Sequence, residues 1–311
     1  MKKVVVTGGA GFIGSNLVKA YLKNDYEVVV VDNLKTGKLD NIPPGVMFYE
    51  VDIRDPQFIE IILKEKPDVI NHHAAQIDVQ FSIQNPVEDA SINILGTLNV
   101  LESLRKLKEQ KDCRLVYASS AAAYGNPSYL GVDEKHSTLP ISFYGASKLS
   151  PEFYVQIYHD LYDIPYSIFR YANVYGIGQD PKGEGGVISI LVERIMNNSL
   201  FTIYGDGEQT RDFIFVDDIV HANLLASERS INDFCNISTH TPTTLHELLN
   251  IAEQVIDRKI ETTYDKEKPG DIKHSFLTND KAENLLNWKP SYSLFEGLKK
   301  TISYYEKMNN Q

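Results

Sequence analysis

The alternation of short apolar runs with helix-length segments constrains the fold of this chain more than any other feature of its sequence. Six apolar runs of strand length occur, at residues 3–7, 27–31, 46–50, 68–71, 114–119 and 166–170. They are continuously apolar rather than alternating, which is typical of strands buried on both faces. Helix-length segments separate them, so the sequence predicts an α/β fold with a doubly wound parallel sheet.

Capping signals indicate where several helices begin. Asp55 and Asn85 each precede a proline, and each is expected to cap a helix that starts at that proline. The segments 244–247 (TLHE) and 293–296 (SLFE) both fit the capping-box pattern, in which a hydroxyl and a carboxylate satisfy each other's backbone N–H groups.

Composition excludes several classes of protein. The 311 residues carry a net charge of −11, which argues against general binding of nucleic acid or anionic membranes. No apolar run approaches the roughly 20 residues that cross a bilayer, and the first segment reaches glycine too early for a signal peptide. Two cysteines provide neither a disulfide framework nor metal-ligand spacing. We therefore expect a cytoplasmic protein without a metal site.

A glycine-rich motif follows the first predicted strand. In the segment TGGAGFIG (residues 7–14), Gly9, Gly11 and Gly14 satisfy G-x-G-x-x-G, and Gly8 extends the pattern. Such a loop exposes backbone N–H groups at a helix N-terminus, where they can hold a pyrophosphate. Asp32 ends the second predicted strand 18 residues after Gly14, the position of a carboxylate that hydrogen-bonds a ribose 2′-hydroxyl. The motif predicts a Rossmann domain that binds NAD rather than NADP.

A second motif carries chemistry. Tyr144 and Lys148 stand four residues apart, so that on a helix they face the same side. A neighbouring ammonium lowers the pKa of a tyrosine, and we predict that Lys148 does so here, which makes Tyr144 usable as a base. Ser120 lies at the end of the fifth predicted strand, at the sheet edge where ligands bind in such folds. It can relay a proton or hydrogen-bond a sugar hydroxyl.

Further segments extend these two motifs along the chain. They are VVVDN (29–33), DIRD (52–55), HHAAQ (72–76), NILGTLNVLE (93–102), SSAAAYG (119–125), YGASK (144–148), RYANVYG (170–176), GDGEQTRDFIFVDDI (205–219) and PGDI (269–272). With TGGAGFIG, they resemble the extended short-chain dehydrogenase/reductases of the NAD-dependent epimerase/dehydratase family. The resemblance covers essentially the whole chain and is strongest to nucleotide-sugar 4-epimerases of the UDP-glucose 4-epimerase type.

The resemblance implies roles for individual residues. The catalytic set is Ser120, Tyr144 and Lys148, of which Tyr144 and Lys148 also contact the cofactor. For NAD binding, the resemblance places Phe12 and Ile13 along the pyrophosphate, Asp32 and Asn33 at the adenosine ribose, and Asp52 and Ile53 beside the adenine. It places Ala74, Ala75 and Asn93 along the nicotinamide half, and the other residues it implies for NAD binding are Gly8, Gly11, Gly14 and Gln76. Those implied for the nucleotide-sugar, besides Ser120 and Tyr144, are Asn173, Val187, Tyr204, Arg211, Lys268, Asp271 and Ser275.

The implied reaction is a 4-epimerisation of a UDP-hexose. Tyr144 removes the proton of the sugar 4-hydroxyl while C4 gives a hydride to NAD. The 4-keto sugar turns over in the site and takes the hydride back on its other face. NAD is regenerated in each cycle and is expected to stay bound.

The chain departs from the family pattern at three positions. Lys268 stands where the family usually has an arginine before Pro-Gly-Asp. A lysine keeps the positive charge but cannot form the two parallel hydrogen bonds that an arginine makes to a diphosphate. Ala122 replaces a hydroxyl residue, and Pro151 lies within a predicted helix that it is expected to bend near residues 147–151. Ser275 is small where the family carries either tyrosine or a small residue, which leaves room for an N-acetyl group.

Two alternatives stay open from the sequence. Another nucleotide-sugar enzyme, such as a 4,6-dehydratase or a UDP-glucuronate epimerase or decarboxylase, is the nearer one. Ala121, Ala122 and Ala123 stand where dehydratases carry acids, which weighs against elimination chemistry. A non-catalytic nucleotide-binding regulator is the second, and the intact Ser120–Tyr144–Lys148 set argues against it.

The length and the family resemblance together predict two lobes. A glycine-rich loop at 176–186 is a natural boundary. We predict an NAD-binding domain over residues 1–175 and a smaller, mixed α/β nucleotide-sugar-binding lobe over residues 176–311. Segments around 211–240 are expected to return to the first domain. The resemblance further implies a homodimer formed through the helices at residues 86–107 and 144–163.

Overall fold

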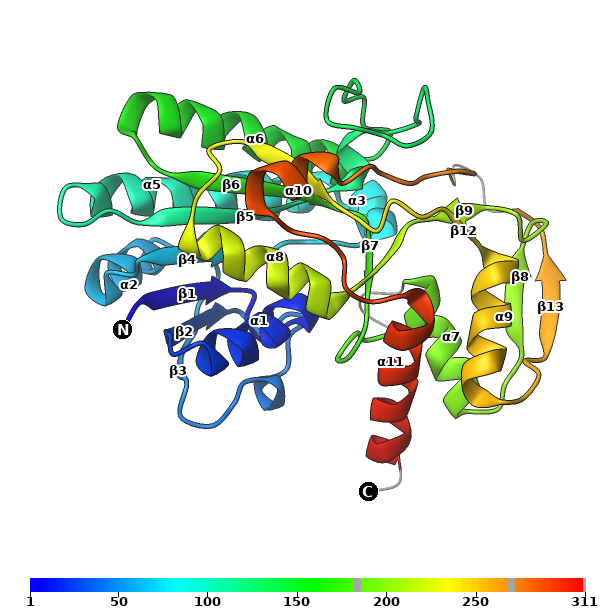
Figure 1. Ribbon diagram of the computed structural model, residues 1–311. Coiled ribbons are helices and arrows are strands. Elements are labelled where there is room, and N and C mark those ends of the chain that lie inside the picture. Colours follow the sequence, from blue (N-terminus) through cyan, green and yellow to red (C-terminus); the bar gives the residue numbers. More distant parts are fainter. Residues whose placement is uncertain (182–185, 268–271, 310–311) are drawn as a thin grey trace.

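A seven-stranded parallel sheet forms the centre of the molecule (Figure 1). The computed structural model describes residues 1–181, 186–267 and 272–309. The strand order is β11–β6–β5–β4–β1–β2–β3, so the chain reverses direction across the sheet between β1 and β4. The strands are β1 (Lys3–Thr7), β2 (Glu27–Asp32), β3 (Met47–Glu50), β4 (Val69–His72), β5 (Arg114–Ser120), β6 (Tyr166–Tyr171) and β11 (Phe234–Ile237). The predicted doubly wound α/β fold is confirmed, and each of the six predicted strands is present to within one residue at either end.

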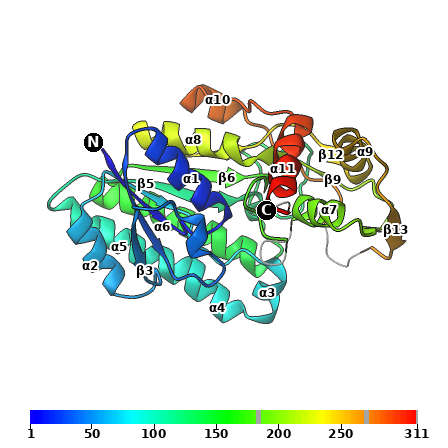
Figure 2. The ribbon, with the colours of Figure 1, turned by 90° about the horizontal axis from the view of Figure 1, so that it is seen from below.

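Helices cover both faces of this sheet, which explains why its strands are apolar throughout (Figure 2). In β1, Val4 and Val6 pack into one core cluster, whereas Val5 between them packs into the other. The first face carries α1 (Phe12–Lys23), α8 (Val216–Glu228) and α10 (Asp280–Leu286). The opposite face carries α2 (Gln57–Glu65), α5 (Gly96–Lys108) and α6 (Phe143–Tyr162).

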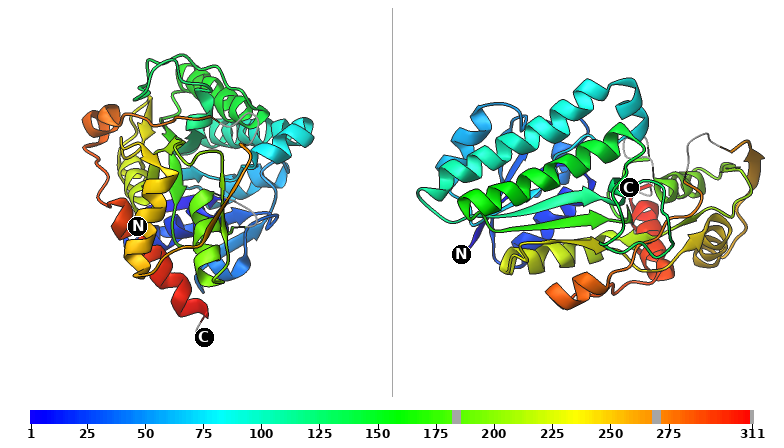
Figure 3. Two further views of the ribbon diagram at one scale, coloured as in Figure 1. Left: turned by 90° about the vertical axis from the view of Figure 1, so that its right-hand side faces the viewer. Right: turned by 90° about the horizontal axis from the view of Figure 1, so that it is seen from above.

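A smaller group of elements lies beyond the carboxyl ends of the sheet strands (Figure 3, right). Leu191, Leu248 and Leu298 belong to its own core cluster. It contains α7 (Val187–Met196), β8 (Phe201–Tyr204), α9 (Leu245–Ile256), β13 (Thr262–Asp265) and α11 (Leu294–Asn309). Since β11, which follows residue 211, pairs with β6 of the large sheet, the chain passes back between the two groups. The predicted boundary at residue 175 stays a prediction.

Short elements complete the fold. At the carboxyl edge of the large sheet lie α3 (Val79–Gln84), α4 (Pro86–Ala90), the π-helical turn η2 (Ser91–Leu95) and the 3-10 turn η3 (Ala121–Ala123). A further 3-10 turn is η1 (Leu39–Asn41). Two small two-stranded sheets pair β7 (Asn173–Tyr175) with β10 (Phe213–Phe215) and β9 (Thr210–Arg211) with β12 (Thr243–Thr244).

Most of the predicted caps are confirmed. Both capping boxes form, at Thr244 with α9 and at Ser293 with α11, and the Asp55 carboxylate accepts from the Gln57 N–H at 2.8 Å. The prediction for Asn85 is wrong, because its amide donates backwards to the Phe81 carbonyl instead of capping α4. The helix α6 runs unbroken across Pro151, and the bend predicted there stays a prediction.

The described residues hold neither a candidate membrane span nor a candidate metal cluster. None of the helices described is long and apolar enough to cross a membrane. Within the same residues, no group of three or more histidine, cysteine or acidic side chains is arranged to hold a metal ion.

Candidate active site

The catalytic set predicted from the sequence meets at the carboxyl edge of the large sheet. Ser120 ends β5, and Tyr144 lies in the first turn of α6, which is capped by the Ser142 hydroxyl accepting from the Gly145 N–H at 3.0 Å. The Ser120 hydroxyl lies close enough to the Tyr144 phenol to favour its ionised form. Lys148 follows one helical turn later and is only 5% exposed. A phenol, a hydroxyl and an ammonium therefore share one sheltered corner.

The electrostatics of this corner correct one prediction. Burial raises the pKa of Tyr144 above its ordinary value of 10.0, and the Ser120 hydroxyl only partly opposes that effect. The predicted lowering by Lys148 is therefore wrong, because desolvation of the phenolate dominates. Burial also lowers the pKa of Lys148 to about 8, although the carboxylates of Glu152 and Asp89 favour its charged form.

A buried ion pair between Glu152 and Arg170 lies next to the catalytic set. Glu152 lies one turn after Lys148 on α6, and its carboxylate accepts from the Arg170 guanidinium at 3.0 and 2.6 Å. The Ser119 hydroxyl, next to Ser120, donates to the same carboxylate. The two charged side chains are 2% and 4% exposed. Because breaking such a pair leaves an uncompensated buried charge, this arrangement fixes β5 against α6 at the height of the site.

The glycine loop between β1 and α1 is shaped to receive a phosphate. A Cβ on Gly14 would lie 2.0 Å from the Gly8 carbonyl oxygen, and one on Gly8 would lie 2.7 Å from the Ala74 nitrogen. The first turn of α1, which begins at Phe12 and Ile13, follows Gly11 and has no side-chain cap. Its N–H groups are thus available to an anion. This cradle fits the pyrophosphate of a dinucleotide.

The residues predicted around the adenosine end lie on one side of this cradle. The Asp32 carboxylate accepts from the backbone N–H groups of Ala10 and Leu34 at 2.9 and 2.8 Å. Asn33 donates to Asp52 at 2.9 Å, and Ile53 beside it is buried. Sequence reasoning missed that Asp52 is paired with Arg54 at 2.8 Å, which lowers the pKa of Asp52 to about 2.

The residues predicted around the nicotinamide end follow β4. The Asn93 amide and the Gln76 backbone exchange two hydrogen bonds, at 2.8 and 3.0 Å. The Ala74 N–H donates to the Thr7 hydroxyl at 3.2 Å, and Ala75 is half-buried. Asn93 also donates to the Ser147 hydroxyl on α6 at 2.9 Å. This end of the cradle is therefore tied to the helix that carries Tyr144 and Lys148.

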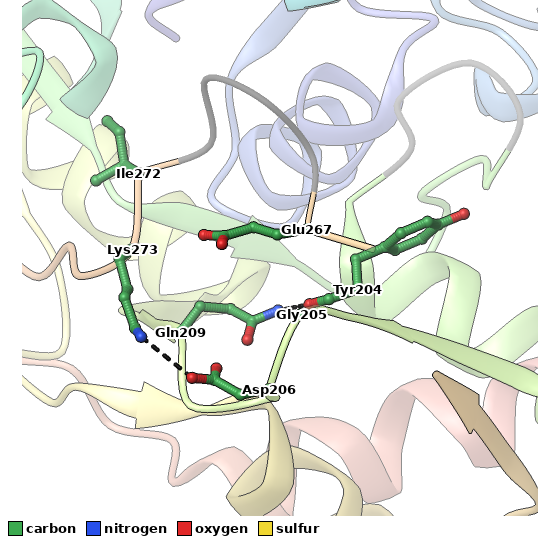
Figure 4. A pocket seen from close by; sticks show the side chains of 7 residues that line it. All are labelled: Tyr204, Gly205, Asp206, Gln209, Glu267, Ile272 and Lys273. Carbon is green, nitrogen blue, oxygen red and sulfur yellow. Dashed lines mark hydrogen bonds and ion pairs between the residues drawn. The ribbon is translucent and has the colours of Figure 1, made fainter. Parts of the chain in front are cut away.

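Most residues predicted for the sugar nucleotide lie in or beside the smaller group of elements. Asn173 is exposed on β7, and Val187 begins α7. Tyr204 ends β8, where it lines a pocket with the acidic Asp206 and Glu267 (Figure 4). The pocket also contains Gly205, Gln209, Ile272 and Lys273, none of which the sequence motifs singled out as ligands. Lys273 pairs with Asp206 at 3.1 Å.

The cations predicted for the diphosphate are only partly described. Arg211 lies on β9, where its guanidinium donates to the carbonyl of Thr210 at 2.9 Å. The backbone of Ser275 donates to the same carbonyl at 3.2 Å, and this residue is half-buried. Lys268 and Asp271 lie outside the described residues. The structure thus brings Arg211 and Ser275 to one edge of the smaller group.

Comparison with known proteins decides the family. A family model described as GDP-mannose 4,6 dehydratase matches residues 5–301. A Methanocaldococcus jannaschii protein named "Putative UDP-glucose 4-epimerase" is 46% identical over 98% of this chain and 99% of its own length. The chain belongs to the NAD-dependent epimerase/dehydratase family.

Solved structures of this epimerase/dehydratase family superpose over nearly the whole chain. The UDP-glucose 4-epimerase of Thermotoga maritima with UDP-glucose is 40% identical, with a TM-score of 0.95 and 99% of both chains covered. The Thermus thermophilus UDP-glucose 4-epimerase complex with NAD is 36% identical, with a TM-score of 0.91 over 98% and 99% of the two chains. A Methanobrevibacter ruminantium UDP-N-acetylglucosamine 4-epimerase, in complex with UDP-N-acetylmuramic acid, is 33% identical, with a TM-score of 0.93 over 99% of both. The family is NAD-dependent, and its members in this group act on several UDP-sugars.

Proposed function

We propose that the protein catalyses the NAD-dependent 4-epimerisation of a UDP-hexose, with UDP-glucose and UDP-galactose as substrates and their N-acetylated counterparts accepted as well. The observation that carries the proposal is the meeting of Ser120, Tyr144 and Lys148 beside the glycine cradle. Full-length similarity to UDP-sugar 4-epimerases supports it.

The residues divide the work between binding and proton transfer. NAD, when bound, supplies the acceptor and donor of a hydride. Backbone N–H groups at residues 12–14 hold its pyrophosphate, and Asp32 orients the adenosine ribose. Tyr144 takes the proton of the sugar 4-hydroxyl, directly or through Ser120, and returns it when the 4-keto sugar is reduced on its other face. Lys148, one helical turn after Tyr144, is available to the cofactor in the same buried corner.

The segment after Ser120 favours epimerisation over dehydration. Elimination of water from a sugar needs an acid and a base beyond the hydroxyl chemistry at C4. The residues that follow Ser120 form the 3-10 turn η3, which consists of three alanines. No acid in this turn can protonate a leaving hydroxyl, which is the reason for placing a 4,6-dehydratase second.

Incubation of the pure protein with UDP-galactose tests the activity. Formation of UDP-glucose, together with NAD released on denaturation, is the expected result. In deuterated water the product should carry no deuterium at C4, because the hydride returns from the carbon that gave it. Solvent deuterium at C4 would contradict this mechanism. If no UDP-glucose forms, the assignment of UDP-glucose and UDP-galactose as substrates is wrong.

Ser275 is proposed to set the tolerance for a 2-N-acetyl group. Its side chain is small, and its backbone is held to Thr210 at the edge where the nucleotide-sugar residues gather. Ser275→Tyr should lower kcat/KM for UDP-N-acetylglucosamine by about tenfold or more, with much less effect on UDP-glucose, since the ring occupies the space of the acetyl group. Equal rejection of UDP-N-acetylglucosamine by both forms of the protein would contradict this role.

A homodimer through α5 and α6 is the proposed assembly. The two helices pack side by side (Figure 3, right). On α6, Phe153, Ile157 and Leu161 recur every four residues and are 55%, 48% and 66% exposed, and Leu95, the last residue of η2 before α5, is 59% exposed. A contiguous exposed apolar face of this kind is typical of an interface.

Ile157→Glu is therefore expected to convert a dimer into a monomer, because a carboxylate would be buried without a partner at the interface. Light scattering coupled to size-exclusion chromatography measures the change. Leu200→Glu is the matched control, since Leu200 is equally exposed, at 53%, and lies outside this face. A monomeric unaltered protein, or a dimer that survives Ile157→Glu, would contradict the assembly.

A further inference from the structure

A buried carboxylate that the reaction does not use lies behind the catalytic corner. Asp89 in α4 is 0% exposed. Its Oδ1 accepts from the Gln76 side-chain amide at 2.7 Å and from the Asn93 amide at 3.3 Å. Its Oδ2 is buried and has no hydrogen-bond partner among the described residues. A buried carboxylate in this condition is costly unless a positive charge comes near it.

Among the described residues, the other buried carboxylates accept hydrogen bonds on both oxygens, and Asp32 does so from two backbone N–H groups. Glu152 forms its ion pair with Arg170. Asp212 accepts from the backbone or side chain of Thr239, His240 and Leu277, and Asp218 accepts from the N–H groups of residues 291 and 292. Asp89 accepts no hydrogen bond from a cation or from a backbone N–H group, so it is the exception among them.

The partners of Asp89 connect it to the cofactor end of the site. Gln76 is implied for NAD binding and Asn93 for its nicotinamide half, and Asn93 reaches the Ser147 hydroxyl between Tyr144 and Lys148. The Asp89 charge is felt at both catalytic side chains, since it favours the charged form of Lys148 and disfavours the phenolate of Tyr144. Its field therefore reaches the place where the nicotinamide ring is expected.

We propose that Asp89 is the counter-charge of the oxidised nicotinamide ring, and that it makes the bound cofactor harder to reduce. The ring is cationic when oxidised and neutral when reduced, so a nearby buried carboxylate stabilises the oxidised form alone. This inference rests on the proposed function. For an epimerase the consequence is useful, because a cofactor that favours its oxidised form returns the hydride to the 4-keto sugar readily and does not remain trapped in the reduced form.

A redox titration of the holoenzyme without sugar tests the proposal, with the near-ultraviolet absorbance of the reduced cofactor as the signal. Asp89→Asn keeps an oxygen for Gln76 but removes the charge. It should shift the preference for oxidised over reduced cofactor by about tenfold, which raises the midpoint potential by roughly 30 mV for a two-electron couple. Asp89→Ser removes the same charge with a shorter side chain and should move the potential in the same direction.

Glu88→Gln is the matched control, because Glu88 is the neighbouring carboxylate on α4 and is 39% exposed beside Arg54. It should leave the potential unchanged. A merely structural Asp89 would alter the unfolding temperature and not the potential, so an unchanged potential in both Asp89 variants would overturn the proposal. Since no sugar is present, a shifted potential in a protein that fails to epimerise UDP-sugars would contradict the proposed function and leave the role of Asp89 standing.

Discussion

Replacing Tyr144 with phenylalanine should lower kcat for UDP-sugar epimerisation by about a thousandfold, while the protein still folds and still holds NAD. The change removes only the phenolic oxygen, whose pKa the Ser120 hydroxyl lowers. A positioned general acid or base contributes about 10²- to 10⁴-fold to a rate, and here one oxygen serves in both directions of the reaction. The ring itself stays, so the packing of α6 against its neighbours changes little.

Two companion variants make this result specific. Tyr162→Phe removes a phenolic oxygen at the far end of α6 and should leave kcat unchanged. Ser120→Ala should cost less than Tyr144→Phe, because the phenol can still reach a sugar hydroxyl without the relay. The measurements are initial rates with UDP-galactose and the NAD content of each purified protein. A Tyr144→Phe protein that keeps more than a tenth of the activity would show that another group moves the proton.

The large sheet could be predicted from the sequence because each of its strands is buried on both faces. In β1, neighbouring valines pack into the core clusters on opposite faces of the sheet. A continuous apolar run of this kind, repeated between helix-length segments, indicates a strand of a buried parallel sheet. The strands of the smaller group give no such signal. All four residues of β13 are exposed, and the strand exists because it pairs with β8 along its length. A pairing of this kind depends on the fold rather than on local sequence.

The site shows the same division between local motif and tertiary context. The glycine cradle and the shared helix face of Tyr144 and Lys148 each depend only on residues within one short segment, so the sequence predicts them. The charge state of Tyr144 depends on burial, which a spacing cannot report, and the prediction of its pKa was wrong for that reason. Asp89 lacks any sequence signal, because its importance arises only from what the fold places around it. Several residues that line the pocket with Tyr204 lie in the motif segments 205–219 and 269–272, but those segments do not show which residues share a pocket.

Gly14→Val should give a protein that is purified without NAD and unfolds at a clearly lower temperature. The reason is steric, since a Cβ at this position would lie 2.0 Å from the Gly8 carbonyl oxygen and 2.8 Å from the Gly9 Cα. All of these neighbouring atoms belong to the backbone, which cannot move aside as a flexible side chain would. Relief of the clash requires the loop between β1 and α1 to open, and that displaces the N–H groups assigned to the pyrophosphate.

Gly45→Ala separates this effect from the general cost of replacing a glycine. Gly45 has a φ of +85°, so alanine there is strained by about 1 kcal/mol, yet its Cβ would meet no atom within 4 Å. The control should lose a little stability and keep its full complement of NAD, whereas Gly14→Val loses the cofactor even where it remains folded. Equal NAD contents in the two proteins would mean that the cradle is not the place where the cofactor is held. Such a result would also remove the geometric basis for placing the nicotinamide ring beside Tyr144 and Asp89.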